Sequence, residues 1–175
     1  MSPEMNLVET DRLLLRLAKK DDFESLYTNV FSKEVVSKYV FSGGVLSYEN
    51  AINLFEKQFN FNGASVYGFL VLVEKSSNNI IGFSGLIPAR HSEHDGYEFG
   101  YVLSESSWGK GYATEIAIGQ IKWALNDLGL KRVYALVSKG NTASMHVVEK
   151  LKLSKAPSVF IEDQGECLVY VAESA

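Results

Sequence analysis

Short apolar runs separated by polar turns mark the first strands that the sequence predicts. Residues 12–17, 67–74, 80–87 and 97–103 are rich in aliphatic, β-branched and aromatic residues, which is typical of strands. The polar turn 76–79 joins the second run to the third, so these two runs predict a hairpin. The first hundred residues therefore predict a strand followed later by an antiparallel meander.

Helical spacing marks the segments between the first strand and this meander. Asp21 and Asp22 are the expected N-cap of a first helix, whose apolar positions are Phe23, Leu26, Tyr27 and Val30. A second, broken helix is expected over residues 33–39. Ser47 is expected to cap a third helix with an apolar stripe of Ile52, Phe55 and Phe59.

The second half of the chain alternates between helices and strands. Residues 111–128 form the longest helical pattern, which Gly129 ends as a C-cap and whose apolar face consists of Ala113, Ile116, Ala117, Ile121, Ala124, Leu125 and Leu128. A strand over 132–137 follows, then a helix from Asn141 or Thr142 to Leu151 and closing strands at about 159–162 and 167–172. This order predicts an α/β sandwich, a single domain over residues 1–175 with a mixed, mostly antiparallel sheet of about seven strands and helices on both faces.

Composition narrows the classes of function. With 46% hydrophobic and 22% charged residues over 175 positions, the chain has the balance of a globular domain. A net charge of −4 argues against direct nucleic-acid binding, and no apolar run approaches the ~20 residues of a membrane span. The N-terminus lacks the pattern of a secretory signal and Cys167 is the single cysteine, so we expect a cytoplasmic location. The oligomeric state, monomer or homodimer, stays open.

The turn between strand 97–103 and the long helix is the most informative stretch. The first amide groups of a helix lack internal acceptors and carry the positive end of its dipole, so they favour a phosphate or pyrophosphate. Gly109 and Gly111 allow close approach of backbone to such an anion, and Lys110 adds charge. A tight turn without any ligand fits the same residues. The spacings of a Walker loop and of a dinucleotide fingerprint do not occur here.

The same turn resembles the acyl-CoA pyrophosphate loop of the GNAT superfamily of N-acetyltransferases, whose pattern is Gln/Arg-x-x-Gly-x-Gly/Ala. Trp108 departs from the first position, while Gly111 and Ala113 match the last two. The form WGKGYATE is usual in the branch that resembles ribosomal-protein N-terminal acetyltransferases (RimJ/RimL type). Residues 141–150 resemble that branch's N-x-x-S-x-x-x-x-E-K-x-G-F, although residues 152–153 are Lys and Leu instead of Gly and Phe. With ETDRLLLR and IIGFSGL, the resemblance spans about residues 8–172.

The resemblance implies where acetyl-CoA binds as a co-substrate, without a metal. Strands 97–103 and 132–137 are implied to splay apart around the pantetheine arm, which pairs with backbone groups of Val102 and Leu103. The side-chain amide of Asn141 is implied to bind the same arm, although helix capping explains an Asn there equally well. The pyrophosphate is implied to bind the backbone amides of Gly109, Lys110, Gly111, Tyr112, Ala113 and Thr114.

Acetyl transfer to an amine calls for a base, because only the neutral amine attacks the thioester. An amine with a pKa near 10.4 is neutral in only about one molecule in 2,500 at pH 7. Glu98 is the candidate base, acting directly or through water, provided that its side chain faces the splayed gap. Strand alternation places Glu98, Gly100 and Val102 on one face; a carboxylate that faces solvent is the competing interpretation.

Many members of the superfamily have a Tyr in the last helix that protonates the departing thiolate, and Val148 stands at the corresponding position here. The branch that the chain resembles has a Ser at Ser144, whose hydroxyl could donate a hydrogen bond to the sulfur. A thiolate with a pKa near 8.5 leaves without full protonation, so a hydroxyl donor can suffice. A mid-helix Ser bonded to its own backbone is the competing interpretation.

Two functions from different classes remain. The first is an N-acetyltransferase on a protein N-terminus or a small amine, and the second is a non-catalytic acyl-CoA-binding module. Glu98 and Ser144 together favour the enzyme. His91 and His94 lie with Glu93 and Asp95 in a polar loop, where we expect solvated side chains and no metal site. The sequence does not choose among a protein N-terminus, a polyamine and an aminoglycoside-like amine as acceptor.

Overall fold

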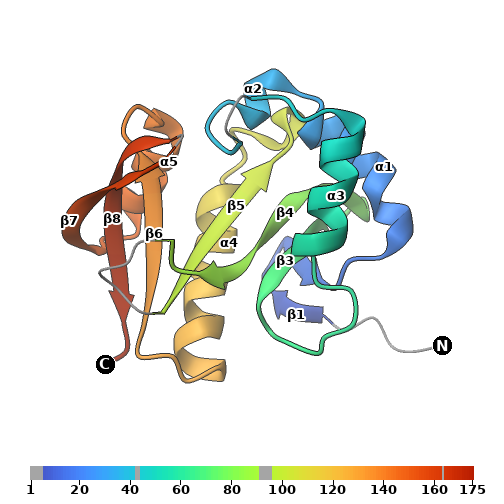
Figure 1. Cartoon of the computed structure of the whole chain (residues 1–175). Helices are drawn as coiled ribbons and strands as arrows, with labels where there is room; N and C mark the ends of the chain where they lie inside the picture. Colours follow the sequence, from blue (N-terminus) through green and yellow to red (C-terminus); the bar gives the residue numbers. More distant parts are fainter. Residues whose placement is uncertain (1–5, 42–43, 91–95, 163) are drawn as a thin grey trace.

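The computed structural model describes residues 6–41, 44–90, 96–162 and 164–175, and these ranges contain one mixed sheet of eight strands (Figure 1). The strands are β1 (Asn6–Glu9), β2 (Leu13–Arg16), β3 (Gly68–Glu74), β4 (Asn79–Pro88), β5 (Tyr97–Leu103), β6 (Arg132–Ser138), β7 (Ser154–Ile161) and β8 (Gly165–Glu173). Their spatial order is β1-β2-β3-β4-β5-β6-β8-β7, and every neighbouring pair is antiparallel except β5 and β6. The α/β architecture is confirmed. The sheet has one strand more than expected, because the short strand β1 was missed.

Two layers of helices cover the sheet. The segments α1 (Phe23–Leu26, continued by the wider helical turn Tyr27–Phe31), α2 (Glu34–Ser37) and α3 (Tyr48–Gln58) pack on one face with the core around Phe31, Phe55 and Phe83. The segments α4 (Tyr112–Lys122, continued by Trp123–Asp127) and α5 (Thr142–Lys150) pack on the other face. No helix within the described ranges is both long and apolar enough to span a bilayer.

Helix ends follow the chemistry expected from the sequence at three of four places. The Ser47 side chain accepts a hydrogen bond from the backbone of Asn50, and Gly129 has a φ of +68° after the long helix. The Asn141 side chain caps α5. Asp22 directly precedes α1 as its N-cap, but its side chain makes no capping hydrogen bond into α1. A 3₁₀ turn begins two residues earlier at Lys20, and the buried Asp22 carboxylate accepts hydrogen bonds from Arg16 (2.8 Å) and from the backbone of Lys19 (2.7 Å), which caps that turn.

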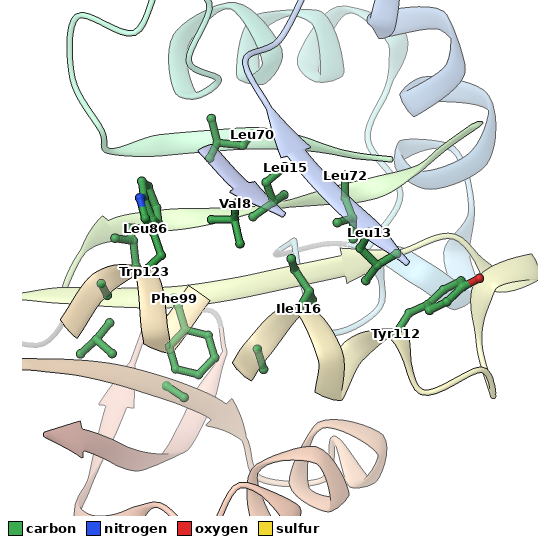
Figure 2. Close-up of a cluster of buried hydrophobic side chains, with 14 of the residues drawn as sticks. Val8, Leu13, Leu15, Leu70, Leu72, Leu86, Phe99, Tyr112, Ile116 and Trp123 are labelled. Carbon is green, nitrogen blue, oxygen red and sulfur yellow. The ribbon is translucent and has the colours of Figure 1, made fainter. Parts of the chain in front are cut away.

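The helix α4 is held against the sheet by an apolar cluster that Figure 2 shows. Ile116, which is fully buried, points toward the strand residues Leu13 and Leu15. Full burial of a side chain of this size stabilises a fold by about 1.5–3 kcal/mol. The buried face also includes Tyr112, Gln120 and Trp123, which the sequence interpretation left out. This packing fixes the position of the N-terminus of α4, where the glycine turn arrives.

The strands β5 and β6 diverge, as the family resemblance implied. Each has a long antiparallel partner on its outer side, whereas among the described residues a single pair, Glu98 with Tyr134, joins them in the sheet. Figure 1 shows β5 leaning away from β6. The sheet therefore opens directly after Glu98.

Candidate active site

A cleft with a volume of about 170 Å³ lies where β5 and β6 part. Four of the predicted site residues line it: Glu98, Val102, Asn141 and Ser144. Its two ends differ. What we call the α5 side is formed by Tyr101, Asn141, Ser144 and Val148. What we call the α2 side is formed by Tyr39, Val40, Phe69, Phe83 and Ile87, on the opposite face of the sheet. The cleft thus passes through the sheet and joins its two faces.

Backbone groups of β5 alternate between the gap and the neighbouring strand β4. A Cβ atom added to Gly82 would lie 1.9 Å from the carbonyl oxygen of Val102, so this carbonyl points toward β4. Because backbone direction alternates along a strand, Tyr101 and Leu103 direct their backbone groups toward the gap. The backbone contact predicted for Val102 is therefore not favoured, whereas the one predicted for Leu103 stays. The Leu103 carbonyl also accepts a hydrogen bond from the indole nitrogen of Trp108 (3.0 Å).

The predicted pyrophosphate loop has a conformation that only glycine adopts readily. Gly109 and Gly111 have φ values of +73° and +81°, and Gly111 directly precedes the first residue of α4. Around Gly109, a Cβ atom would meet nothing within 4 Å, so the loop is bordered by open space. Lys110 is exposed, whereas Tyr112 is buried and makes only its backbone available to a ligand. The arrangement places a glycine turn directly before a helix N-terminus, whose first amides lack internal acceptors, as an anion site requires.

Glu98 meets the condition set for a base, because its carboxylate lines the cleft and only 3% of the residue is exposed. The side-chain Nε of Arg90 donates to Oε1 (2.7 Å), and the backbone of Arg90 donates to Oε2 (3.2 Å). Burial raises the pKa of Glu98, and the Arg90 charge and hydrogen bonds only partly offset it. A carboxylate accepts about four hydrogen bonds, so Glu98 can still accept one from a water or an amine.

Ser144 and Tyr101 meet on the α5 side. The Ser144 hydroxyl lies toward the Tyr101 oxygen as a donor, which lowers the pKa of Tyr101, but burial is the larger cause and raises this pKa. The phenol therefore stays neutral and can donate. Asn141 accepts from the backbone of Ser144 through Oδ1 (3.2 Å), so it caps α5 while it also lines the cleft. Tyr101 was missed in the sequence, although it shares the alternating face of Phe99 on its strand.

Comparison with known proteins identifies the family. Residues 12–154 match the acetyltransferase (GNAT) domain family, which is most of the chain. The chain belongs to the GNAT acetyltransferase family. It is therefore an acetyl-CoA-dependent N-acetyltransferase. Its more specific resemblance to the RimJ/RimL branch stays a prediction.

Individual relatives agree with this GNAT membership. An uncharacterized N-acetyltransferase of Bacillus subtilis, YoaA, is 28% identical over 85% of this chain and 83% of its own length. An acetyltransferase from Agrobacterium tumefaciens has a similar structure, with a TM-score of 0.78, 25% identity and coverage of 99% of this chain and 96% of its own. A spermidine N-acetyltransferase from Vibrio cholerae, solved with CoA and spermine, shares the fold at 18% identity, with a TM-score of 0.74 and coverage of 94% and 96%.

In this GNAT chain the loop is tied to the N-terminal strands through Arg12, which sequence reasoning missed. The Arg12 guanidinium donates to the carbonyl of Lys110 (2.8 Å) and to Glu115 Oε2 (2.7 Å). Burial raises the pKa of Glu115, but hydrogen bonds from Thr10 and Arg12 outweigh burial and hold this pKa below its usual value. The segment ETDRLLLR contained the signal, an Arg directly before an apolar strand, but its partner 103 residues away could not be read.

Metal ligation has no support in the part of the chain that the structure describes. Within it, no group of three or more His, Cys, Asp or Glu side chains could hold an ion. His91, Glu93, His94 and Asp95 lie outside the described residues. His146 is exposed on α5.

Proposed function

We propose that this GNAT protein transfers the acetyl group of acetyl-CoA directly to a primary amine, with Glu98 as base and Ser144 as hydrogen-bond donor to the departing sulfur. The observation that carries the proposal is that Glu98 and Ser144, 46 positions apart in the sequence, line one cleft at the point where β5 and β6 part. One chain spanning residues 1–175 as a single domain would contain the whole site. The lone cysteine supports a cytoplasmic location.

The coenzyme would enter from the face of α4 and α5. The amides from Gly109 to Thr114 would bind the pyrophosphate, and the gap-facing backbone of Leu103 would pair with the pantetheine. Asn141 retains two N–H donors on its side-chain amide, which suit a carbonyl of the arm. This course brings the thioester into the cleft beside Ser144.

The reaction then follows from the groups around the thioester. The amine nitrogen forms a bond to the acetyl carbon, and the bond between carbon and sulfur breaks. The proton of the amine passes to Glu98, whose raised pKa makes it a better base than an exposed carboxylate. The thiolate leaves with its electron pair and accepts a hydrogen bond from Ser144, whose hydroxyl would turn to the sulfur from the Tyr101 oxygen.

A non-catalytic acyl-CoA-binding module is the alternative. Val148, at the position where the family resemblance implies a Tyr, is buried and offers no acid, which is the observation in favour of the alternative. A carboxylate held at 3% exposure with a raised pKa argues against it, because a mere binder has no use for a buried base.

The test is turnover with the purified chain. Acetyl-CoA would be mixed with single amines and with short peptides that have free N-termini, and thiol release would be followed together with the mass of each product. We expect an increase of 42 Da on the acceptor that matches the released thiol one for one. Saturable acetyl-CoA binding without turnover on any acceptor would contradict the enzyme and support the binding module. A Glu98→Gln, Ser144→Ala double variant serves as the control for uncatalysed transfer.

A further inference from the structure

Among the described residues, the acceptor end of the cleft is lined mostly by apolar side chains, and its one carboxylate, Glu98, is paired with Arg90. On the proposed function, the amine reaches Glu98 from the α2 side, because the coenzyme occupies the α5 side. The α2 side is formed by two residues that follow α2 and three from β3 and β4, namely Tyr39, Val40, Phe69, Phe83 and Ile87. We infer that the acceptor is a small amine with one amino group on an apolar body, and that polyamines and aminoglycoside-like polycations are poor acceptors.

Charge is the first argument. Glu98 is the only carboxylate among the described residues that line the cleft, and its negative charge is already matched by Arg90 at 2.7 Å. Lys38 adds a further positive charge near the entrance, with its Nζ 5.2 Å from the centre of the Tyr39 ring. A polyamine keeps at least one ammonium group after its reacting nitrogen becomes neutral. That ammonium would be buried near the Arg90 cation, and none of the described lining residues offers it a second carboxylate, which is costly.

Desolvation is the second argument. An apolar environment disfavours the charged form of an amine and lowers its pKa. A monoamine that enters between Val40, Phe83 and Ile87 therefore loses its proton more easily, and its apolar body is stabilised by the burial. The same surroundings assist the reaction of a monoamine and penalise the second charge of a diamine.

Size is the third argument. The cleft of about 170 Å³ is smaller than the roughly 300–1,000 Å³ of ordinary ligand pockets, and the acetyl group takes part of it. The remaining space suits a body about as large as one aromatic ring or one branched aliphatic chain. Tyr39, 41% exposed at the entrance, is placed to cover such a body.

The experiment compares two amines of similar basicity on the full chain, phenylethylamine and spermidine, by thiol release at low ionic strength. We expect kcat/KM for phenylethylamine to exceed that for spermidine by tenfold or more. An equal or higher value for spermidine would overturn the inference and leave the proposed function standing. No turnover with either amine or with any peptide, while acetyl-CoA still binds, would overturn both.

Variants at the entrance make the test specific. Tyr39→Glu adds a carboxylate at an exposed position, so we expect the ratio of kcat/KM for spermidine over phenylethylamine to rise by tenfold or more. Tyr39→Ser should raise KM for phenylethylamine about fivefold. Phe160→Glu, at a residue that is 79% exposed on β7, is the matched control and should leave the ratio unchanged. An unchanged acetyl-CoA affinity verifies the fold of each variant. If the ratio of kcat/KM for spermidine over phenylethylamine changes equally for the variants at residues 39 and 160, the apolar acceptor site is refuted.

Discussion

The proposed pyrophosphate loop and the proposed acceptor end of the cleft are built in opposite ways. The loop is a continuous stretch whose proposed binding groups are backbone amides, and Arg12 and Glu115 hold it in place from outside. The acceptor end draws its residues from β3, β4, β5 and the turn after α2, and it presents side chains. Backbone recognition suits a ligand that does not vary, such as a coenzyme. Side-chain recognition allows the acceptor to change by substitution at a few positions without disturbing the coenzyme site.

The largest effect on kcat/KM without an effect on acetyl-CoA affinity is expected at Glu98, which separates the acceptor end of the cleft from the loop. Glu98→Gln preserves the shape of the side chain but cannot accept the proton of the amine. We expect kcat/KM at neutral pH to fall by about 10² to 10⁴, with acetyl-CoA affinity unchanged. The loss should shrink as pH rises, because solution then supplies neutral amine. Parallel pH–rate profiles of equal height for both proteins would remove Glu98 from the mechanism.

The pH dependence of the wild type sharpens this result. Glu98 must be ionised to act, and its pKa lies above the usual range because burial outweighs Arg90. Activity should therefore rise with pH through a value above that of an exposed carboxyl. Arg90→Gln removes the group that favours the ionised form, so this acid limb should move to higher pH and not disappear.

The second-largest effect is expected at Ser144, the proposed donor to the departing coenzyme sulfur where the two regions meet. Ser144→Ala should lower kcat by about tenfold to a hundredfold with little change in acetyl-CoA binding, because the hydroxyl acts mainly on developing charge. Thr142→Ala, at an exposed position on the same helix, is the control. A variant with normal kcat would assign Ser144 a structural role in α5.

The third effect lies in the loop alone. Gly111→Asp places a side chain and a negative charge where the pyrophosphate would bind, so the Kd for acetyl-CoA should rise tenfold or more, about 1.4 kcal/mol or above. Gly129→Asp imposes a similar backbone strain at a φ of +68° beyond the opposite end of the same helix, and a Cβ there meets open space. Calorimetry should show a loss of affinity at residue 111 only. Equal losses at both positions would point to helix strain.

The smallest effect tests the support of the loop. Arg12→Gln removes the hydrogen bond to Lys110 and the ion pair with Glu115, so we expect the Kd for acetyl-CoA to rise about twofold to tenfold, as for the loss of one hydrogen bond of ordinary strength. Arg132→Gln breaks the exposed pair with Glu173 and controls for the change in net charge. If both variants bind alike, the loop keeps its conformation without Arg12.

Features set by neighbouring residues could be read from the sequence. The hairpin of β3 and β4, the long helix α4 and the cap at Ser47 all depend on spacing within a few positions. The loop with Gly109 and Gly111 is local in the same sense. The strand β1 was not predicted because it has only four residues and one buried position, Val8, so it shows no clear alternation of apolar and polar residues.

Features set by distant residues could not be read. Arg90, which follows β4, meets Glu98 on β5, and Tyr101 meets Ser144 between a strand and a helix. Each pairing depends on strand register and on the packing of α5, which single positions do not encode. For the same reason the direction of the Val102 carbonyl became known only from its contact with Gly82.

The indole of Trp108 gives the protein an optical reporter at the proposed coenzyme site. The sequence contains two tryptophans, and Trp123 is only 6% exposed within the core, so its emission is shielded from ligands. Trp108 is 44% exposed beside the loop, and its ring nitrogen donates to the last residue of β5. A coenzyme that occupies the loop changes the solvent around this ring, so fluorescence of the unlabelled wild-type protein should follow binding in real time.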